Sequence, residues 1–277
     1  MPSRPSLLYV SNLAYPARGR RYCDEDIHLT ADLRQHFDLA ICHPEDAAAL
    51  MRAHDVVVVR NSGPISDYAP AYHHFRDQAE ATGQRVYNPL TGKGDMAGKQ
   101  YLVDLTTAGF PVIPTVDDPN HLDRLPPAAE YVVKPKAGAD SHGLEFVPEN
   151  DLRRVLAEKA GDDLLVQPKI DFEYEVSFYF VDHDFQYALN APDPARRWEL
   201  VPYEASRADL EFAQRFIDWN TLDHGIQRVD ACRTRQGDLL LVELEDLNPY
   251  LSLDRTPEVT RTRFVEAMAA SIRRSLG

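Results

Sequence analysis

Residues 131–147 read Tyr-Val-Val-Lys-Pro-Lys-Ala-Gly-Ala-Asp-Ser-His-Gly-Leu-Glu-Phe-Val, and this stretch decides the fold that the sequence predicts. An apolar run to Val133 and a second, alternating run at the end predict two strands joined by a loop. Lys134 stands where the first strand ends, so its ammonium group is directed towards the loop. Gly138 and Gly143 allow positive φ and a close approach of the backbone, so the loop N–H groups can surround a polyphosphate beside Lys134. A surface hairpin with an incidental lysine accounts for these residues equally well.

The scarcity of lysine favours the phosphate-binding interpretation. The chain has 30 basic residues, but its lysines stand only at positions 93, 99, 134, 136, 159 and 169. Four of these lysines fall in three short segments of one kind. Such a concentration is more typical of a binding site than of a solvated surface.

Composition restricts the class of protein. The 277 residues are 44% hydrophobic and 27% charged, as in an ordinary globular protein, and they allow one large domain or two to three small ones. A net charge of −14 argues against a protein that neutralises a nucleic-acid backbone. Three cysteines far apart indicate neither a disulfide framework nor a zinc site. Because no run has the length of a membrane span or of a signal peptide, we expect a cytoplasmic protein without a membrane partner.

The first 92 residues predict a small α/β unit. Strands are expected at 7–10, 39–42, 56–59 and 86–87, and helices at 24–33, 46–54 and 72–82. Alternating strands and helices predict a parallel sheet whose ligand-facing residues follow the carboxyl ends of the strands. Arg60 follows the strand of four valines, where it could hold a substrate carboxylate, although a plain surface arginine is the commoner outcome.

The middle of the chain alternates glycine-rich loops with short elements. Gly92, Gly94 and Gly98 precede Lys99 and a helix to about residue 108, without the spacing of a P-loop. A helix is expected at 150–160 with Asn150 as its N-cap. The strand expected at 164–170 contains Pro168, which cannot donate a ladder hydrogen bond, so the strand must end there or lie at an edge. Backbone groups exposed in this way suit the edge of an adenine.

The last third predicts a sheet with two long helices. Strands are expected at 174–181, 185–189 and 198–201, followed by a hairpin of 227–233 and 238–245. Ser206-Arg-Ala-Asp209 resembles a capping box and predicts a helix to Trp219. A final helix is expected at 256–276 with Thr256 as its N-cap and Pro257 in its first position.

Three carboxylates of the hairpin predict a metal site. Glu243 and Glu245 are two residues apart on one strand, so they point to the same face, and Asp230 stands on the preceding strand. Like charges side by side on a sheet repel unless a cation lies between them, and Mg²⁺ takes oxygen ligands. A solvated acidic edge is the alternative, but the apolar run 239–242 is typical of a core strand.

Several motifs in the right order resemble the ATP-grasp superfamily. These are Lys99 before a helix, V-V-K-P at 132–135 with its glycine loop, and L-V-Q-P-K-I at 165–170 followed by Glu175. The pattern is most similar to the glutathione-synthetase and RimK-like branch, and V-V-V-V-R, V-Y-N-P and G-K-Q-Y-L resemble the pre-ATP-grasp domain of that branch. The resemblance implies an α/β (α+β) fold in three parts. They are a Rossmann-like pre-ATP-grasp domain over 1–92, a central ATP-grasp subdomain over 93–172 and a C-terminal subdomain with the metal site over 173–277.

The resemblance also implies roles for individual residues. Lys99 and Lys134 would contact the nucleotide phosphates, and a flexible loop from Gly138 to Gly143 would cover them. The remaining nucleotide contacts would come from Ser141, His142, Gln167, Lys169, Ile170 and Glu175, with Gln167 and Ile170 along the adenine and Glu175 on the ribose. The metal would be held by Asp230, Glu243 and Glu245, with Asn248 as a further ligand or phosphate contact. Arg197 matches the arginine that meets the transferred phosphoryl group, and Arg196 competes for this role.

This sequence departs from the family pattern at three places. The loop has fewer glycines than many relatives, Gln167 stands where an acidic residue is common, and Glu245 stands in the place of an asparagine.

The activity that the resemblance implies is ADP-forming ligation. ATP with Mg²⁺ (or Mn²⁺) would activate a small carboxylate, such as an amino acid or a peptide, as an acyl phosphate, and an amine would then displace phosphate to form an amide. An intramolecular cyclase or a kinase on the same fold, or a non-catalytic nucleotide-binding regulator, stays open as an alternative. Whether the protein is a homodimer also stays open.

Overall fold

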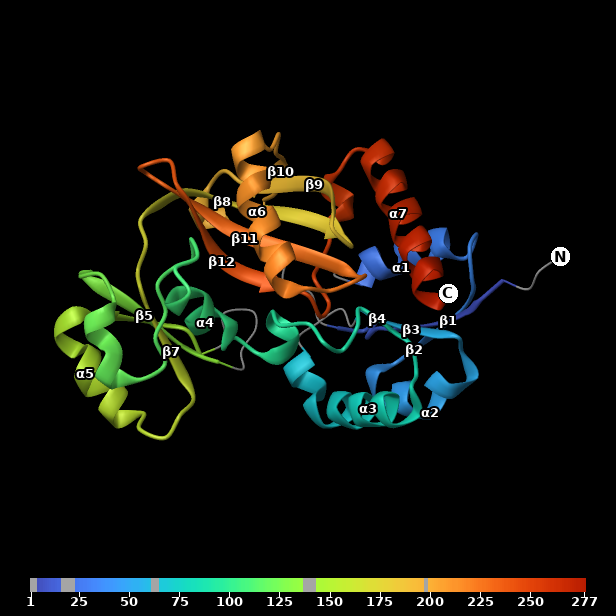
Figure 1. The fold of residues 1–277 in the computed structure, drawn as a ribbon, viewed down its shortest axis with the longest axis horizontal. Coiled ribbons are helices and arrows are strands. Elements are labelled where there is room, and N and C mark those ends of the chain that lie inside the picture. The colour runs from blue at the N-terminus through green and yellow to red at the C-terminus, as the bar shows by residue number, and fades with distance from the viewer. Residues whose placement is uncertain (1–3, 16–22, 61–64, 137–142, 197–198) are drawn as a thin grey trace.

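The computed structural model describes residues 4–15, 23–60, 65–136, 143–196 and 199–277. Their strands form three sheets, which follow one another along the chain. Figure 1 shows the sheet of β1 to β4 at one end of an elongated molecule, the sheet of β5 to β7 at the other, and the sheet of β8 to β12 above and between them.

The N-terminal sheet is parallel, as the alternation of strands and helices predicts. Its strands lie in the order β2-β1-β3-β4, with β1 paired to β2 and β3, and β3 to β4. They are β1 (Ser6–Val10), β2 (Asp38–Cys42), β3 (Val56–Val59) and β4 (Val86–Tyr87). All four strand positions are confirmed to within one residue.

The helices of this unit match the prediction except for one. Helices α1 (Cys23–Leu33) and α3 (Ala69–Thr82) lie where the sequence places them. The helix predicted at 46–54 is wrong as a single helix, because α2 (Ala47–Leu50) lies between two 3₁₀ turns, Pro44–Asp46 and Met51–Ala53. So short a segment begins on a tight turn at its proline and tightens again at its end, as helix termini commonly do.

The central sheet is antiparallel, in the order β6-β5-β7. Its strands are β5 (Glu130–Pro135), β6 (Glu145–Pro148) and β7 (Leu164–Pro168). Strand β7 lies at the edge of this sheet and ends at Pro168, which confirms both consequences expected of the proline. Helix α5 (Glu149–Glu158) begins directly after β6, and Asn150 lies inside its first turn and is not the N-cap. Pro148 fills that position with φ −57° and ψ 146°, values that its ring allows, and no side chain caps the helix.

The C-terminal sheet is antiparallel, in the order β10-β9-β8-β11-β12. Its strands are β8 (Phe172–Val181), β9 (Asp184–Ala191), β10 (Val201–Pro202), β11 (Ile226–Thr234) and β12 (Leu239–Glu245). The strand expected at 198–201 is thus only partly observed, since Trp198 lies outside the described residues and β10 begins at Val201.

Three helices accompany this sheet. Helix α4 (Tyr101–Thr107) follows Lys99, and α6 (Arg207–Asn220) begins with the predicted capping box of Ser206 and Asp209. Helix α7 (Glu258–Leu276) is capped by Pro257 and not by Thr256, whose hydroxyl donates to the Leu253 carbonyl oxygen instead.

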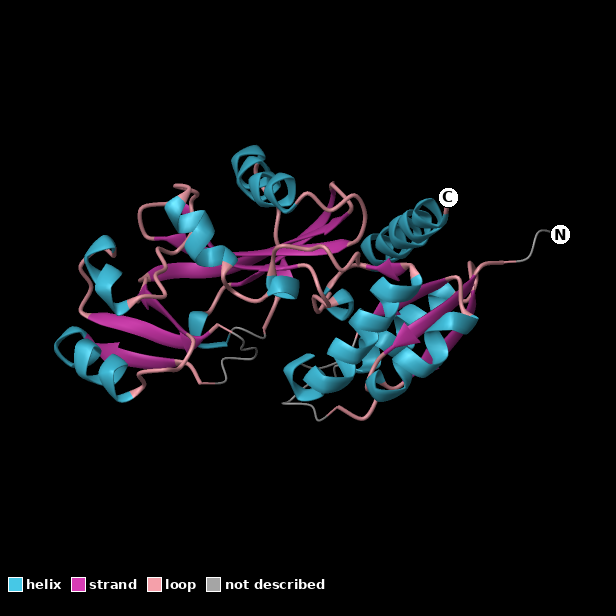
Figure 2. Ribbon diagram, turned by 60° about the horizontal axis from the view of Figure 1, so that its bottom comes forward, coloured by secondary structure: helices cyan, strands magenta, loops and turns pink. Residues whose placement is uncertain are grey.

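The N-terminal and C-terminal sheets share one core. Helices α2 and α3 cover one face of the β1–β4 sheet (Figures 1 and 2), and Leu8 and Val57 point into that layer. On the other face, Tyr9 packs in a cluster that includes Tyr179 of β8 and Phe264 of α7. The first unit of the chain therefore rests directly on the last. None of the helices in the described residues is both long and apolar enough to cross a membrane.

Candidate active site

Three carboxylates meet on one face of the β11–β12 hairpin. In the register of the two strands, Asp230 lies opposite Glu243, and Arg228 lies opposite Glu245. One oxygen from each of Asp230, Glu243 and Glu245 lies within 4.8 Å of the others, and all three side chains are partly buried. The structure therefore brings together the predicted metal ligands, which we call the carboxylate cluster.

Arg228 belongs to this cluster and was not predicted as a site residue. Its Nη2 lies 2.8 Å from Asp230 Oδ2 and also forms an ion pair with Glu245. Its Nη1 donates to the Tyr250 carbonyl oxygen at 2.8 Å. The signal was present in the sequence, because Arg228 and Asp230 are two residues apart on one strand and must share a face.

Lys99 and Lys134 approach the cluster from outside the hairpin. Lys99 Nζ lies 2.8 Å from Glu243 Oε1. Burial raises the pKa of Glu243, but Lys99, together with Lys134 and Arg228, outweighs burial and holds this pKa below its ordinary value. Burial raises the pKa of Glu245 above its ordinary value, and the attraction of Arg228 offsets only part of the rise. The pKa values of the two glutamates are therefore shifted in opposite directions, although both residues lie on one strand.

A second pair of acids fixes the segment that leads to Lys99. Asp246 is fully buried and accepts hydrogen bonds from the N–H groups of Gly94 (2.8 Å) and Met96 (2.9 Å). In return, Asp95 Oδ1 accepts from the N–H groups of Asp246 (2.6 Å) and Leu247 (3.0 Å). We call this reciprocal arrangement the Asp95–Asp246 clasp. It joins the chain before α4 to the end of β12.

Two glycines of that segment, Gly92 and Gly94, are needed because the backbone approaches β12 closely. A Cβ atom on Gly94 would lie 2.6 Å from the Leu244 carbonyl oxygen, and one on Gly92 would lie 2.3 Å from Asp246 Oδ2. Packing against β12 thus explains Gly92 and Gly94, whereas Gly98 has a left-handed φ of +84° and open space around its Cβ position.

The central sheet presents a partly open apolar surface beside Lys134. Val132 pairs with Phe146 on one side and with Gln167 on the other, so these side chains lie on the face that carries Lys134. The opposite face is buried under α5 by a separate cluster. The Phe146 side chain is 57% exposed, an unusual value for a phenylalanine.

The residues predicted along an adenine lie at the end of β7. The Gln167 side chain is buried and donates to Thr115 Oγ1 at 2.8 Å, so it is already used within the protein. Lys169 is exposed, ion-paired with Glu130, and its Nζ lies 5.1 Å from the centre of the Phe146 ring. Ile170 is half-buried just beyond the strand.

Glu175 lies on β8 and Asn248 lies in the loop after β12. Glu175 is two residues before Ser177 on β8, and Ser177 Oγ donates to Asp230 Oδ1 at 2.6 Å, so alternation places Glu175 on the same face. Asn248 Nδ2 donates to the carbonyl oxygen of Arg60 at 3.3 Å, which directs it towards the N-terminal unit. Its role as a ligand or phosphate contact stays a prediction.

The expectation that Arg60 is a surface residue is wrong. It is 4% exposed and lies under the loop after β12, where its Nη2 donates to the Pro249 carbonyl oxygen at 2.6 Å. Its guanidinium also lies 3.4 Å from Glu25. Burial of this kind depends on a segment almost two hundred residues away, which local sequence cannot reveal.

Four predicted site residues, Gly138, Ser141, His142 and Arg197, lie outside the described residues. Gly143, the last residue of the predicted loop, has φ of +73°, and a Cβ atom there would lie 2.9 Å from Pro135 Cγ. Arg196 is exposed and ion-paired with Asp193 and Glu199.

The chain is similar to known proteins in both sequence and structure. No model of a protein family matches the sequence. The chain is 24% identical over 272 residues to the cycloserine biosynthesis protein DcsG of Streptomyces lavendulae, and the match spans 84% of this chain and 88% of that protein.

The structural matches span nearly the whole chain. The crystal structure of D-cycloserine synthetase DcsG matches with a TM-score of 0.74 and 21% identity, over 96% of this chain and 99% of that one. D-alanine–D-alanine ligase from Bacillus anthracis complexed with ATP matches with 0.69 and 12% identity over 98% of each chain. The ATP-grasp ligase PsnB complexed with a minimal precursor matches with 0.65 and 16% identity, over 96% and 99%. The chain has the ATP-grasp fold.

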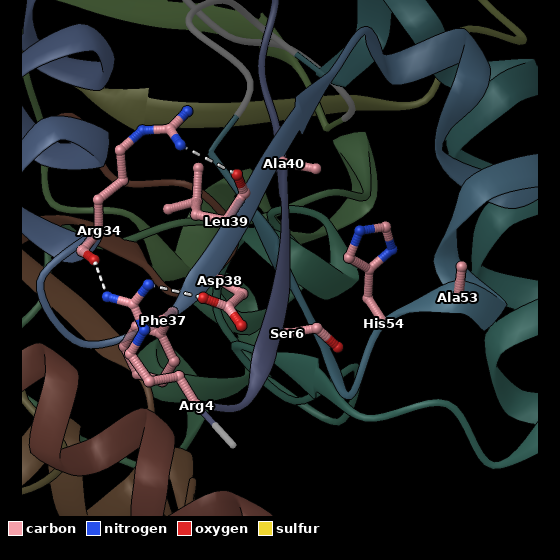
Figure 3. A pocket seen from close by; sticks show the side chains of 9 residues that line it. All are labelled: Arg4, Ser6, Arg34, Phe37, Asp38, Leu39, Ala40, Ala53 and His54. Carbon is pink, nitrogen blue, oxygen red and sulfur yellow. Dashed lines mark hydrogen bonds and ion pairs between the residues drawn. The ribbon is translucent and has the colours of Figure 1, made fainter. Parts of the chain in front are cut away.

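A surface hollow of this ATP-grasp chain lies away from the carboxylate cluster. It has a volume of about 560 Å³ and is lined by residues at the start of β1 and β2, whereas Arg60 stands at the opposite, carboxyl ends of the strands. Figure 3 shows that Arg4 is held there by the Arg34 carbonyl oxygen (2.9 Å) and by Asp38 (2.8 Å). Because these polar groups satisfy one another, we assign no ligand to it.

Proposed function

We propose that the protein is an ATP-dependent ligase that activates a small carboxylate as an acyl phosphate and joins it to an amine, releasing ADP and phosphate. The observation that carries the proposal is the convergence of Lys99 and Arg228 on three carboxylates, on an ATP-grasp fold. The solved structures with this fold that resemble the chain include D-alanine–D-alanine ligase complexed with ATP.

In this proposal the nucleotide lies between the central and C-terminal sheets. Lys134 and Lys99 would contact its phosphates from the two sides, since both lie close enough to Glu243 to affect its pKa. The base would rest on the face of Val132 and Phe146. Because the buried Gln167 side chain is already bonded within the protein, the backbone groups of β7 would form the hydrogen bonds to the edge of the base. Glu175 would contact the ribose.

The carboxylate cluster fits a divalent cation. Its donors are all carboxylate oxygens, which are the ligands that Mg²⁺ prefers, and they lie within 4.8 Å of one another. Asp230, Glu243 and Glu245 would hold the ion, and Arg228 would fix the orientation of two of them. When bound, Mg²⁺ would offset the charge of the phosphate oxygens, which otherwise keeps two anions apart.

The proposed reaction depends on the stabilisation of negative charge. An oxygen of the substrate carboxylate attacks the γ-phosphorus, the bond to the β,γ-bridging oxygen breaks, and ADP leaves. Lys99, Lys134 and Arg228 would stabilise the negative charge that develops on the phosphoryl oxygens. An amine next attacks the acyl carbon, loses a proton and displaces phosphate. This scheme requires no side-chain nucleophile.

A screen for ADP release tests the proposal. Amino acids and small peptides are offered singly and in pairs with ATP and Mg²⁺, and ADP, phosphate and the mass of the product are measured. Pairs that release ADP only together, with a product lighter than the two substrates by one water, would identify both halves of the substrate. ATP bound tightly without any ADP release, across the whole screen, would instead favour a regulatory protein.

An intramolecular cyclase is the second candidate. The specific observation in its favour is that the relative found in both comparisons is a D-cycloserine synthetase. A single substrate that carries both a carboxylate and a nucleophilic nitrogen would then cause the release of ADP and phosphate without a second substrate, and its product would be lighter by one water. A product that is heavier by a phosphoryl group, without free phosphate, would indicate a kinase.

A further inference from the structure

The loop after β12, residues 248–253, is held by side chains from four separate parts of the chain. It has no regular structure until the 3₁₀ turn Leu253–Arg255, yet most of its backbone polar groups are bonded. Arg60 donates to the Pro249 carbonyl oxygen (2.6 Å), Arg228 to that of Tyr250 (2.8 Å), and Tyr187 to that of Leu251 (2.7 Å). We call this segment the 248–253 loop.

Glu25, from the first turn of α1, holds the N–H side of the same loop. Its Oε1 accepts from the N–H of Leu251 at 2.9 Å and its Oε2 from that of Leu253 at 3.2 Å. Both oxygens of the ionised carboxylate accept a hydrogen bond from the loop. A protonated acid or an amide would instead place a donor group of its own next to a backbone N–H, and two donors cannot form a hydrogen bond. The side chain is 3% exposed and also lies 3.4 Å from Arg60.

A continuous set of hydrogen bonds runs from Glu25 to the carboxylate cluster. Glu25 accepts hydrogen bonds from the N–H groups on either side of Ser252, a residue with a left-handed φ of +54°. The first of these N–H groups, that of Leu251, belongs to the same peptide unit as the Tyr250 carbonyl oxygen, which accepts from Arg228. Arg228 in turn contacts Asp230 and Glu245. The position of the Arg228 guanidinium therefore depends on a carboxylate that belongs to the N-terminal unit.

We infer that Glu25 is a positioning residue of the metal site: through the 248–253 loop it holds Arg228, and with it Asp230 and Glu245, in the arrangement that binds a divalent cation. The inference rests on the proposed function. It assigns to the N-terminal unit a part in metal binding, although none of the described residues of that unit belongs to the carboxylate cluster. Support from outside the ligand shell of a metal typically changes affinity by about 10–100-fold.

The test is the affinity for Mn²⁺ in the presence of saturating ADP, followed by the electron paramagnetic resonance signal of free Mn²⁺. Burial raises the pKa of Glu25 to about 7, against the effect of Arg60 and the two N–H groups. The titration is therefore done at a pH more than one unit above that value, where the carboxylate is ionised. Glu25→Gln is expected to weaken Mn²⁺ binding by about tenfold.

A double-mutant cycle separates positioning from general destabilisation. In an Arg228→Lys background, Glu25→Gln is expected to have little further effect, because its influence passes through Arg228. Asp182→Asn is the matched control, since Asp182 is also a largely buried carboxylate that accepts a backbone N–H (Gly225, 2.9 Å) and pairs with an arginine, Arg274. This control is expected to lower stability without changing Mn²⁺ affinity.

The outcomes are distinct. Wild-type protein that binds no Mn²⁺ would overturn the proposed function together with this inference. Wild-type binding with the same affinity in Glu25→Gln, or equal effects of this change in both Arg228 backgrounds, would overturn the inference alone. Should Glu25→Gln not fold, Tyr187→Phe decides, because it releases the Leu251 carbonyl oxygen from the other side. It is expected to weaken Mn²⁺ binding, and an unchanged affinity would contradict the inference.

Discussion

Lys99 Nζ lies 2.8 Å from Glu243 Oε1, so the residue before α4 is ion-paired with the middle of the carboxylate cluster. Burial alone would lower the pKa of Lys99, but Glu243 and Glu245 raise it above its ordinary value. The ammonium group therefore stays charged in a partly buried place. A side chain that stays positively charged beside the carboxylate cluster is suited to bind a phosphate group at this site.

Replacement of this cation is expected to abolish turnover without unfolding the protein. Lys99→Met should lower the rate of ADP release by about 10²–10³, because a preorganised charge is lost from the reacting phosphate. Lys159→Met is the control, since Lys159 also pairs with a glutamate (Glu145, 2.7 Å) but does so at the surface. Equal rates for the two variants would argue against the assigned role of Lys99.

Glu243→Gln is expected to abolish turnover by loss of metal binding. The change keeps the size of the side chain but removes one of three charges that hold the cation, so ADP release should fall by about 10²–10³. The melting temperature and the dependence of ADP release on Mg²⁺ concentration are measured together. Glu211→Gln, which breaks only the surface pair with Arg207, should behave as the wild type. Normal turnover in Glu243→Gln would refute the metal assignment.

Phe146→Ala is expected to raise KM for ATP with little change in stability. A base stacked on an aromatic ring gains about 1–3 kcal/mol, which corresponds to roughly 5–150-fold in affinity. The ring is 57% exposed, so its removal leaves no cavity. Val259→Ala, at another exposed apolar side chain (76%), is the control. An unchanged KM for ATP in Phe146→Ala would place the base elsewhere.

Gly94→Ala is expected to destabilise the protein by about 1–3 kcal/mol, as overpacking does. The new Cβ atom would meet the Leu244 carbonyl oxygen at 2.6 Å, and a backbone atom of a central hairpin cannot move aside easily. Since the Asp95–Asp246 clasp would open, KM for ATP should also rise through Lys99. Urea unfolding and steady-state kinetics measure the two effects. In Gly161→Ala, where the Cβ atom meets nothing within 4 Å, only the conformational cost of φ +106° is expected.

The stability of the protein is expected to fall between about pH 4.5 and pH 7 because of Glu25. Burial raises its pKa from the ordinary value of 4.5 to about 7, so the folded state holds a proton that the unfolded state has released in this range. A rise in pH then favours the unfolded state, by at most about 3 kcal/mol once both values are passed. Urea unfolding of wild type and Glu25→Gln across this range measures the difference. Parallel curves would contradict it.

Much of the fold was accessible from local sequence patterns. The four-valine strand, the capping box of Ser206 and the end of β7 at Pro168 follow from periodicity and from the geometry of single residues. The same holds for Glu243 and Glu245, because residues two apart on a strand share a face whatever surrounds them. The wrong N-caps at Asn150 and Thr256 show the limit of this reasoning, since a proline occupies each N-cap position and neither helix has a side-chain capping hydrogen bond.

The sequence by itself therefore determined which strands exist, where they end and which of their side chains lie together on one face. Only the tertiary structure decided what covers each face: that Arg60 is buried under Pro249, that Asp95 and Asp246 join two distant segments, and that Glu25 holds the 248–253 loop. The physical reason is that side chains alternate between the two faces of a strand, but this alternation does not specify which face becomes buried. Which side becomes a core and which a charged site depends on segments more than a hundred residues away, brought there by the packing of whole sheets.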